Sequence, residues 1–127
     1  MDQQDKSAHT PGPWFADSDG NVWRRPPSDL YQNGGGVAGD KPIATANKGW
    51  HGGSEVGYPV EANAKLIAAA PELYEACLTM IAWDDAEKNA NPYDDDGGKA
   101  WRERIELCSS AFKKARAALA KAVGEQP

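Results

Sequence analysis

The chain has 127 residues, of which 40% are hydrophobic and 26% are charged, and its formal net charge is −5 at pH 7. This length fits one domain with a core of modest size, and this composition excludes a wholly disordered chain. The sequence has no stretch near the roughly 18 apolar residues of a membrane span and no apolar run at its start, so we expect a cytoplasmic protein without membrane contact.

The charge is unevenly distributed along the chain. Residues 1–98 carry 7 Lys and Arg against 16 Asp and Glu (−9), whereas residues 99–127 carry 7 against 3 (+4). An acidic chain lacks the basic footprint that nonspecific binding to duplex DNA requires. The pattern therefore predicts no duplex nucleic acid partner, and it leaves a local cationic surface near the C-terminus.

The N-terminal part is typical of a small β-sheet. Residues 1–10 are polar and are predicted to form a flexible tail. Two short aromatic or β-branched runs, at 11–16 and 21–24, flank a turn rich in Asp and Gly at 17–20, a pattern that predicts a β-hairpin. A third run at 42–46 is predicted to add a strand.

Two long Gly-rich connections, at 25–41 and 47–59, interrupt this part of the chain. Structureless connections of this length within a small domain are usually functional or disordered. They contain three aromatic residues, Tyr31, Trp50 and Tyr58.

From residue 60 onward, apolar residues recur at steps of three and four, which indicates amphipathic helices. Pro71 predicts either a kink or two nearly continuous helices, and a polar connection at 89–98 separates them from a last helix that Gly124 ends. The first apolar row is Leu66, Ile67, Ala70, Leu73, Tyr74, Cys77, Leu78 and Ile81, and the second is Trp101, Ile105, Cys108, Phe112, Ala115 and Leu119.

Together these patterns predict one α+β domain over residues 11–127. Its small antiparallel sheet with Gly-rich loops occupies 11–59, and an antiparallel helical hairpin packed along the two apolar rows occupies 60–124. Because such a domain has a thin core, we expect the rows to be buried further in a homodimer or higher homo-oligomer with a four-helix seam.

Cys77 and Cys108 are predicted to lie at nearly the same height on the facing helices of the hairpin. They have no CxxC spacing, and two packed thiols are favoured over a disulfide in a reducing compartment. The sequence leaves the bonded alternative open.

No motif for catalysis, a metal or a cofactor stands out. His9 and His51 are the only histidines, too few for a zinc site with these two cysteines. The acidic run Asp94, Asp95 and Asp96 lacks the spacing of a calcium loop, and His51 with its neighbours lacks the separation typical of a triad. We therefore predict a protein that is not an enzyme and needs no cofactor.

Cationic and aromatic residues form the most informative pattern. A row on one side of the last helix could meet phosphates, and aromatic rings near the sheet offer faces for stacking a base. The alternative for each residue is a solvated cation or a ring that covers the core. The candidate ligand-binding residues are Trp14, Phe15, Arg24, Arg25, Trp50, Asn63, Arg102, Lys113 and Arg116, with Trp23 and Tyr58 as further rings.

Two segments carry a resemblance to a known family. His9-Thr10-Pro11-Gly12-Pro13-Trp14 and the segment at 62–76, which reads Ala-Asn-Ala-Lys-Leu-Ile-Ala-Ala-Ala-Pro-Glu-Leu-Tyr-Glu-Ala, resemble a family of small proteins of tailed bacteriophages and prophages. The two segments cover about a sixth of the chain. The architecture also resembles the first described class of Thoeris anti-defence sponges, which combine a small sheet with two helices, form oligomers and bind cyclic nucleotide signals.

This resemblance implies a phage protein that acts in the host cytoplasm. The hypothesis is a noncatalytic sponge that sequesters a cyclic nucleotide or cyclic ADP-ribose-type immune signal in a pocket between protomers. The alternative is a protein-interaction module that inhibits a host enzyme through the acidic surface at Asp94, Asp95 and Asp96.

Overall fold

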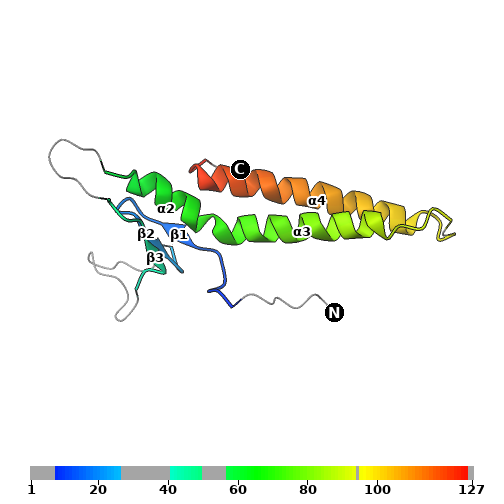
Figure 1. Ribbon diagram of the computed structural model, residues 1–127, viewed down its shortest axis with the longest axis horizontal. Helices are drawn as coiled ribbons and strands as arrows, with labels where there is room; N and C mark the ends of the chain where they lie inside the picture. The colour runs from blue at the N-terminus through cyan, green and yellow to red at the C-terminus, as the bar shows by residue number, and fades with distance from the viewer. Residues whose placement is uncertain (1–7, 27–40, 50–56, 94, 126–127) are drawn as a thin grey trace.

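A computed structural model describes residues 8–26, 41–49, 57–93 and 95–125. In these residues the strands β1 (Phe15–Ala16), β2 (Asn21–Trp23) and β3 (Ala44–Thr45) form an antiparallel sheet in the order β1-β2-β3. The helices α2 (Val60–Ala68), α3 (Ala70–Lys88) and α4 (Lys99–Ala122) follow. Figure 1 shows α3 and α4 side by side as a long antiparallel pair, with the sheet beside α2 at one end. The predicted α+β architecture is confirmed.

The turn between β1 and β2 is organised by the carboxylate of Asp17. It accepts hydrogen bonds from the indole Nε1 of Trp23 at 2.8 Å and from the backbone amides of Asp19 at 2.9 Å and Asn21 at 3.0 Å. Partial burial alone raises the pKa of this carboxyl, but the bonds from Trp23, Asn21 and Asp19 together bring its pKa below the ordinary value of 3.8.

Because the pKa of Asp17 is lowered in the folded state, its contribution to stability is complete above the unfolded pKa. That contribution is lost as the pH falls through the lowered, folded-state value. The wild-type protein should lose unfolding free energy as the pH is lowered from about 5 to about 2, and Asp17→Asn should lose less over the same range, measured by urea unfolding. Asp19→Asn is the matched control in the same turn and should keep the wild-type pH dependence; equal curves for all three proteins would contradict the assignment.

The sheet and α2 enclose the main hydrophobic core. Val22 lies in the central strand and is 0% exposed, and it packs with Ala46 and with Ala64 and Ala68 of α2. Gly20 precedes this strand with a φ of +89°, and an added Cβ there would lie 3.0 Å from Cβ of Val60. The sheet therefore sits directly against α2.

Pro71 separates two helices. It occupies the first turn of α3, where the missing N–H costs no intrahelical hydrogen bond, and α2 and α3 are bent by 41° at this break. Within the described residues no single helix has the length and apolar character to span a membrane, although α2 and α3 taken together meet both criteria.

The ends of α4 follow local sequence signals. The carboxylate of Asp96 accepts the amides of Gly98 and Ala100, both at 3.0 Å, and these backbone bonds, that of Ala100 first, lower the pKa of Asp96. At the other end Gly124 has a φ of +82°, and the amide of Glu125 bonds the carbonyl of Ala120 at 2.8 Å. Gly124 therefore ends the helix as predicted.

The face of α4 that packs against α3 differs from the predicted apolar row, which is a correction to the expected seam. Ala111 and Ala118 are 0% exposed, and Ala76 of α3 is 3% exposed. Small side chains let the two helix backbones approach closely, whereas larger ones would separate them. The predicted seam residues Trp101, Ile105, Phe112 and Leu119 instead remain 44–59% exposed.

The two cysteines are free thiols, but they do not lie at the same height. The hydrogen bond from Lys114 to Thr79 and the ion pair of Arg104 with Glu87 set the register of α3 against α4. In that register Cys77 lies about 12 Å along the helix axis from the level of Cys108, at about 1.5 Å per residue. The prediction that the two thiols lie at nearly the same height was therefore wrong. It assumed that α3 and α4 pair symmetrically about the middle of their connection, and the observed register is shifted from that.

Candidate functional site

The two segments with family resemblance meet at the start of α3. Gly12 lies so close to Pro71 that an added Cβ at position 12 would stand 2.7 Å from Cβ of Pro71. Only glycine fits this contact without a shift of the chain, and the bond between Gly12 and Pro13 is cis. Segments almost sixty residues apart in the sequence therefore form one surface.

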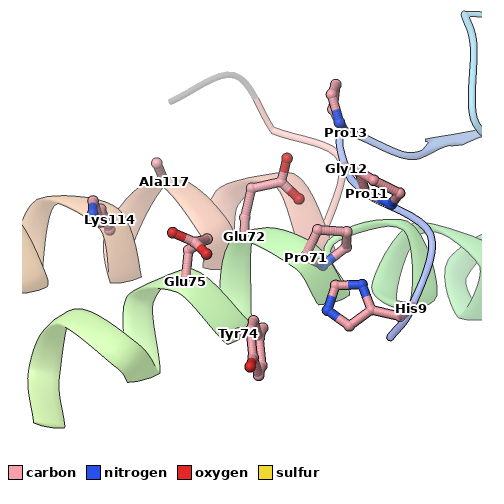
Figure 2. A pocket seen from close by; sticks show the side chains of 10 residues that line it. All are labelled: His9, Pro11, Gly12, Pro13, Pro71, Glu72, Tyr74, Glu75, Lys114 and Ala117. Atoms are coloured by element: carbon pink, nitrogen blue, oxygen red, sulfur yellow. The ribbon is translucent and has the colours of Figure 1, made fainter. Parts of the chain in front are cut away.

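This surface is hollowed into a cavity of about 450 Å³. Figure 2 shows the chain before β1 crossing the first turn of α3, with His9 beside Pro71 and Tyr74. The cavity has the size of a small-molecule site. Its lining residues are His9, Pro11, Gly12, Pro13, Pro71, Glu72, Tyr74, Glu75, Lys114 and Ala117.

One wall of the cavity is formed by rings. The imidazole of His9 meets the ring of Tyr74 edge to face, with centroids 5.2 Å apart, and it meets Trp14 in the same manner at 6.2 Å. The indole Nε1 of Trp14 donates to the carbonyl of Thr10 at 3.1 Å, which fixes the segment. This wall offers flat, largely apolar faces to a ligand.

The other wall carries charge from α3 and α4. Glu72 accepts from Nζ of Lys121 at 2.9 Å through Oε2, while its Oε1 is buried and has no hydrogen-bond partner among the described residues. Lys114 donates to Oγ1 of Thr79 at 2.9 Å, and Glu75 is exposed at the rim. The wall can therefore accept hydrogen bonds from a ligand and place an ammonium group beside it.

A second, smaller hollow of about 190 Å³ adjoins this cavity through the Glu72–Lys121 pair. Trp14 and Phe15 line it together with Lys65 and Lys121, and Nζ of Lys121 lies 5.8 Å from the centroid of the Phe15 ring. Lys65 lies 3.7 Å from the carboxylate of Glu61 and is 39% exposed. The lining of this hollow therefore combines two lysines with two aromatic residues.

Comparison with protein families identifies the chain. The model of one family, described as Salmonella phage P22 protein Y8K6, matches residues 1–126. The chain belongs to this family. The predicted bacteriophage origin is thereby confirmed for the family as a whole. No curated protein and no solved structure matches the chain.

In this member of the P22 Y8K6 family, the residues predicted to bind a ligand are only partly brought together. Trp14 and Phe15 share the smaller hollow, and Asn63 lines a third one beside Lys65, Leu66 and Leu119. Arg24 and Arg25 are exposed just after β2. Trp50 and Tyr31 lie outside the described residues.

The cationic row of α4 does not reach these hollows. Arg102 donates through Nη1 to the carbonyl of Gly97 at 3.0 Å, at the far end of the helix pair from the sheet. Lys113 is exposed, and the guanidinium of Arg116 lies 5.8 Å from the centroid of the Phe112 ring. Arg102 and Arg116 are about 21 Å apart along the axis, too far to grip one small ligand together.

Sequence reasoning missed several residues of the two hollows, namely Tyr74, Glu72 and Lys114 in the cavity and Lys65 and Lys121 in the smaller hollow. The resemblance segments contained part of the signal, because Tyr74 and Glu72 directly follow Pro71. Lys114 and Lys121 carried no signal, since their place in the site depends on how α4 packs. Among the described residues, no group of His, Cys, Asp and Glu side chains has an arrangement that could hold a metal ion.

Proposed function

We propose that this phage protein is a noncatalytic sponge that binds and sequesters a nucleotide-derived immune signal of the cyclic nucleotide or cyclic ADP-ribose type in the host cytoplasm. The observation that supports this proposal is the pair of adjoining hollows at the start of α3, which join an aromatic wall to lysine side chains. Such a combination suits a ligand with a flat base and a phosphate.

In this proposal the base lies against the rings of His9 and Tyr74, whose edge-to-face contact leaves ring faces available. The exposed carboxylate of Glu75 accepts hydrogen bonds from exocyclic amino groups of the base. Lys114, Lys65 and Lys121 neutralise the phosphates, each as a flexible point charge. The site lies within one chain, whereas the sequence hypothesis put it between protomers.

Binding alone is sufficient for this role, because a sponge lowers the free concentration of a signal without breaking a bond. Isothermal titration calorimetry with a panel of cyclic dinucleotides and cyclic ADP-ribose isomers tests the proposal, with recovery of the intact ligand after denaturation as the control against hydrolysis. We expect one ligand class to bind at micromolar protein. The proposal would be contradicted if no member of the panel gave a heat of binding, or if the bound ligand were converted.

Lys114→Ala is expected to weaken binding of that ligand about tenfold, because the loss of one charge-assisted contact costs about 1.5 kcal/mol. Lys114 is exposed and donates to Thr79 at the surface, so the fold should persist. Lys88→Ala, at the far end of α3, is the matched control and should bind like wild type. Equal affinities for all three proteins would contradict the placement of the phosphate.

A second candidate, an interaction module that inhibits a host enzyme, is favoured by Tyr93. This ring is 90% exposed in the acidic connection between α3 and α4. Asp95 is exposed beside it, whereas the carboxylate of Asp96 is engaged by α4, and Asp94 lies outside the described residues. Two results together would favour this candidate over the sponge. The protein would form a complex with a host protein that Asp95→Asn weakens, and it would bind no nucleotide.

A further inference from the structure

The large hydrophobic residues of the helices are mostly not used inside the chain. The hydrophobic residues buried among the described ones are seven alanines with Val22 and Trp23. Eight large residues of the helices stay more than a third exposed, namely Leu66, Tyr74, Leu78, Ile81, Trp101, Ile105, Phe112 and Leu119. A core of alanines contributes little hydrophobic free energy, since the gain grows with the apolar area buried.

Most of these exposed residues lie on one side of the α3–α4 pair. The rings of Trp83 and Phe112 meet across one edge of the pair at 6.5 Å, whereas Lys114 bonds Thr79 across the other edge. At about 100° per residue, Trp101, Ile105, Cys108, Phe112 and Leu119 of α4 fall on the Phe112 side. On α3, Leu73, Cys77, Met80 and Ile81 fall on the same side, away from Thr79.

This surface, called here the apolar face, continues onto α2. Leu66 and Leu119 line one hollow together with Val123, near the C-terminal end of α4. The face therefore runs over three helices. Contiguous apolar surfaces of this extent are rare on monomers and mark sites of association.

We propose that a second copy of this chain covers the apolar face and completes a four-helix bundle, with α3 of one copy lying over α4 of its partner. The first support is the spacing of the α4 row, which advances by 4, 3, 4, 3 and 4 residues from Trp101 to Leu119. That is the spacing of residues that interlock with another helix of the same kind. Within the described residues, α3 packs on the alanine face of α4 and meets this row only at its edge, where Trp83 lies beside Phe112.

The second support is charge. At about 100° per residue, Asp85 lies at the outer edge of the apolar face on α3, whereas Arg102, Lys113 and Arg116 lie at its outer edge on α4. Asp84 lies within the face and is paired with Lys88 at 2.9 Å. A two-fold axis parallel to the helices brings Asp85 of each copy to the basic edge of the other. An axis that laid α4 over α4 would set the basic edges together, and like charges would oppose the assembly.

The third support is size. The row from Trp101 to Leu119 spans about 27 Å at about 1.5 Å per residue, and two packed helices are about 20 Å wide. The projected footprint is therefore roughly 500 Å². Since the accessible area of a side-chain surface exceeds its projection, this is close to the roughly 800 Å² per partner that stable complexes bury.

Sedimentation velocity of the full chain without ligand tests the proposal and does not depend on the proposed function. We expect a dimer at micromolar concentration. Ile105→Asp and Ile81→Asp should each raise the dimer dissociation constant at least about a hundredfold, because a two-fold interface contains every substitution twice. Tyr93→Asp replaces an equally large exposed residue outside the face and should leave the dimer intact.

The two thiols give a readout without substitution, since Cys77 and Cys108 both lie on the apolar face. Their alkylation rates, followed by mass spectrometry, should fall as the protein concentration rises through the dissociation constant. Lys113→Glu should weaken the dimer if α3 lies over α4, and tighten it if α4 lies over α4. A wild-type monomer at about 100 µM, thiol rates independent of concentration, or a tighter Lys113→Glu dimer would each overturn the proposal.

Discussion

Replacing Ala111 with aspartate is expected to lower the free energy of unfolding by about 3–5 kcal/mol. Ala111 is 0% exposed on the face of α4 that packs against α3, so the new carboxylate would be buried between the two helices. Since domains of this kind are stable by roughly 5–15 kcal/mol, the change removes a large share of the total. Urea unfolding followed by circular dichroism measures it.

Ser109→Asp is the matched control for this prediction. It places the same charge on the same helix two residues away, at an exposed position, and should change the stability by less than about 0.5 kcal/mol. The comparison distinguishes the observed alanine face from the apolar row expected from the sequence. If the aspartate at position 111 were tolerated as well as that at 109, the packing of α4 on α3 described above would be wrong.

Gly20→Ala is expected to lower the free energy of unfolding by about 2–3 kcal/mol. A residue with a side chain at a φ of +89° costs about 1–2 kcal/mol in backbone strain. The added Cβ would also stand 3.0 Å from Cβ of Val60 and 3.5 Å from Cβ of Ala46, inside the contact between the sheet and α2. Chemical unfolding monitored by tryptophan fluorescence measures the loss.

Gly97→Ala separates the two contributions to this effect. Gly97 also has a positive φ, +70°, but an added Cβ there would meet nothing within 4 Å. The variant should therefore show the backbone strain alone, about 1–2 kcal/mol. The difference between the free energies of unfolding lost by the two variants measures the packing of the sheet on α2. Equal losses would show that this packing is loose.

The sequence determined the elements whose cause is local. The turn of Asp17 to Gly20 forms because an aspartate can bind nearby amides and a glycine can adopt a positive φ. Pro71 separates α2 from α3, and Gly124 ends α4, for equally local reasons of backbone geometry. The fold class followed from the order of these elements.

For the candidate site the sequence supplied the segments but not their contact. It marked Gly12 and Pro71 as parts of two characteristic segments, and it marked Trp14 and Phe15 as possible ligand contacts. It gave no reason to join Glu72 with Lys121, which are 49 residues apart, because that pair exists only when α4 is placed on α3. The basic row of α4, prominent in the sequence, lies outside the cavity for the same reason.

The tertiary structure alone decided which face of α4 is buried. Periodicity reports that a helix has an apolar side, but two helices of one chain pack where their backbones approach most closely, and here alanines permit that approach. The periodic row of large residues is left on the surface, where its spacing and flanking charges suit a second copy. The sequence thus determined that α4 has an apolar row, and only the packing decided that this row lies outside the contact with α3.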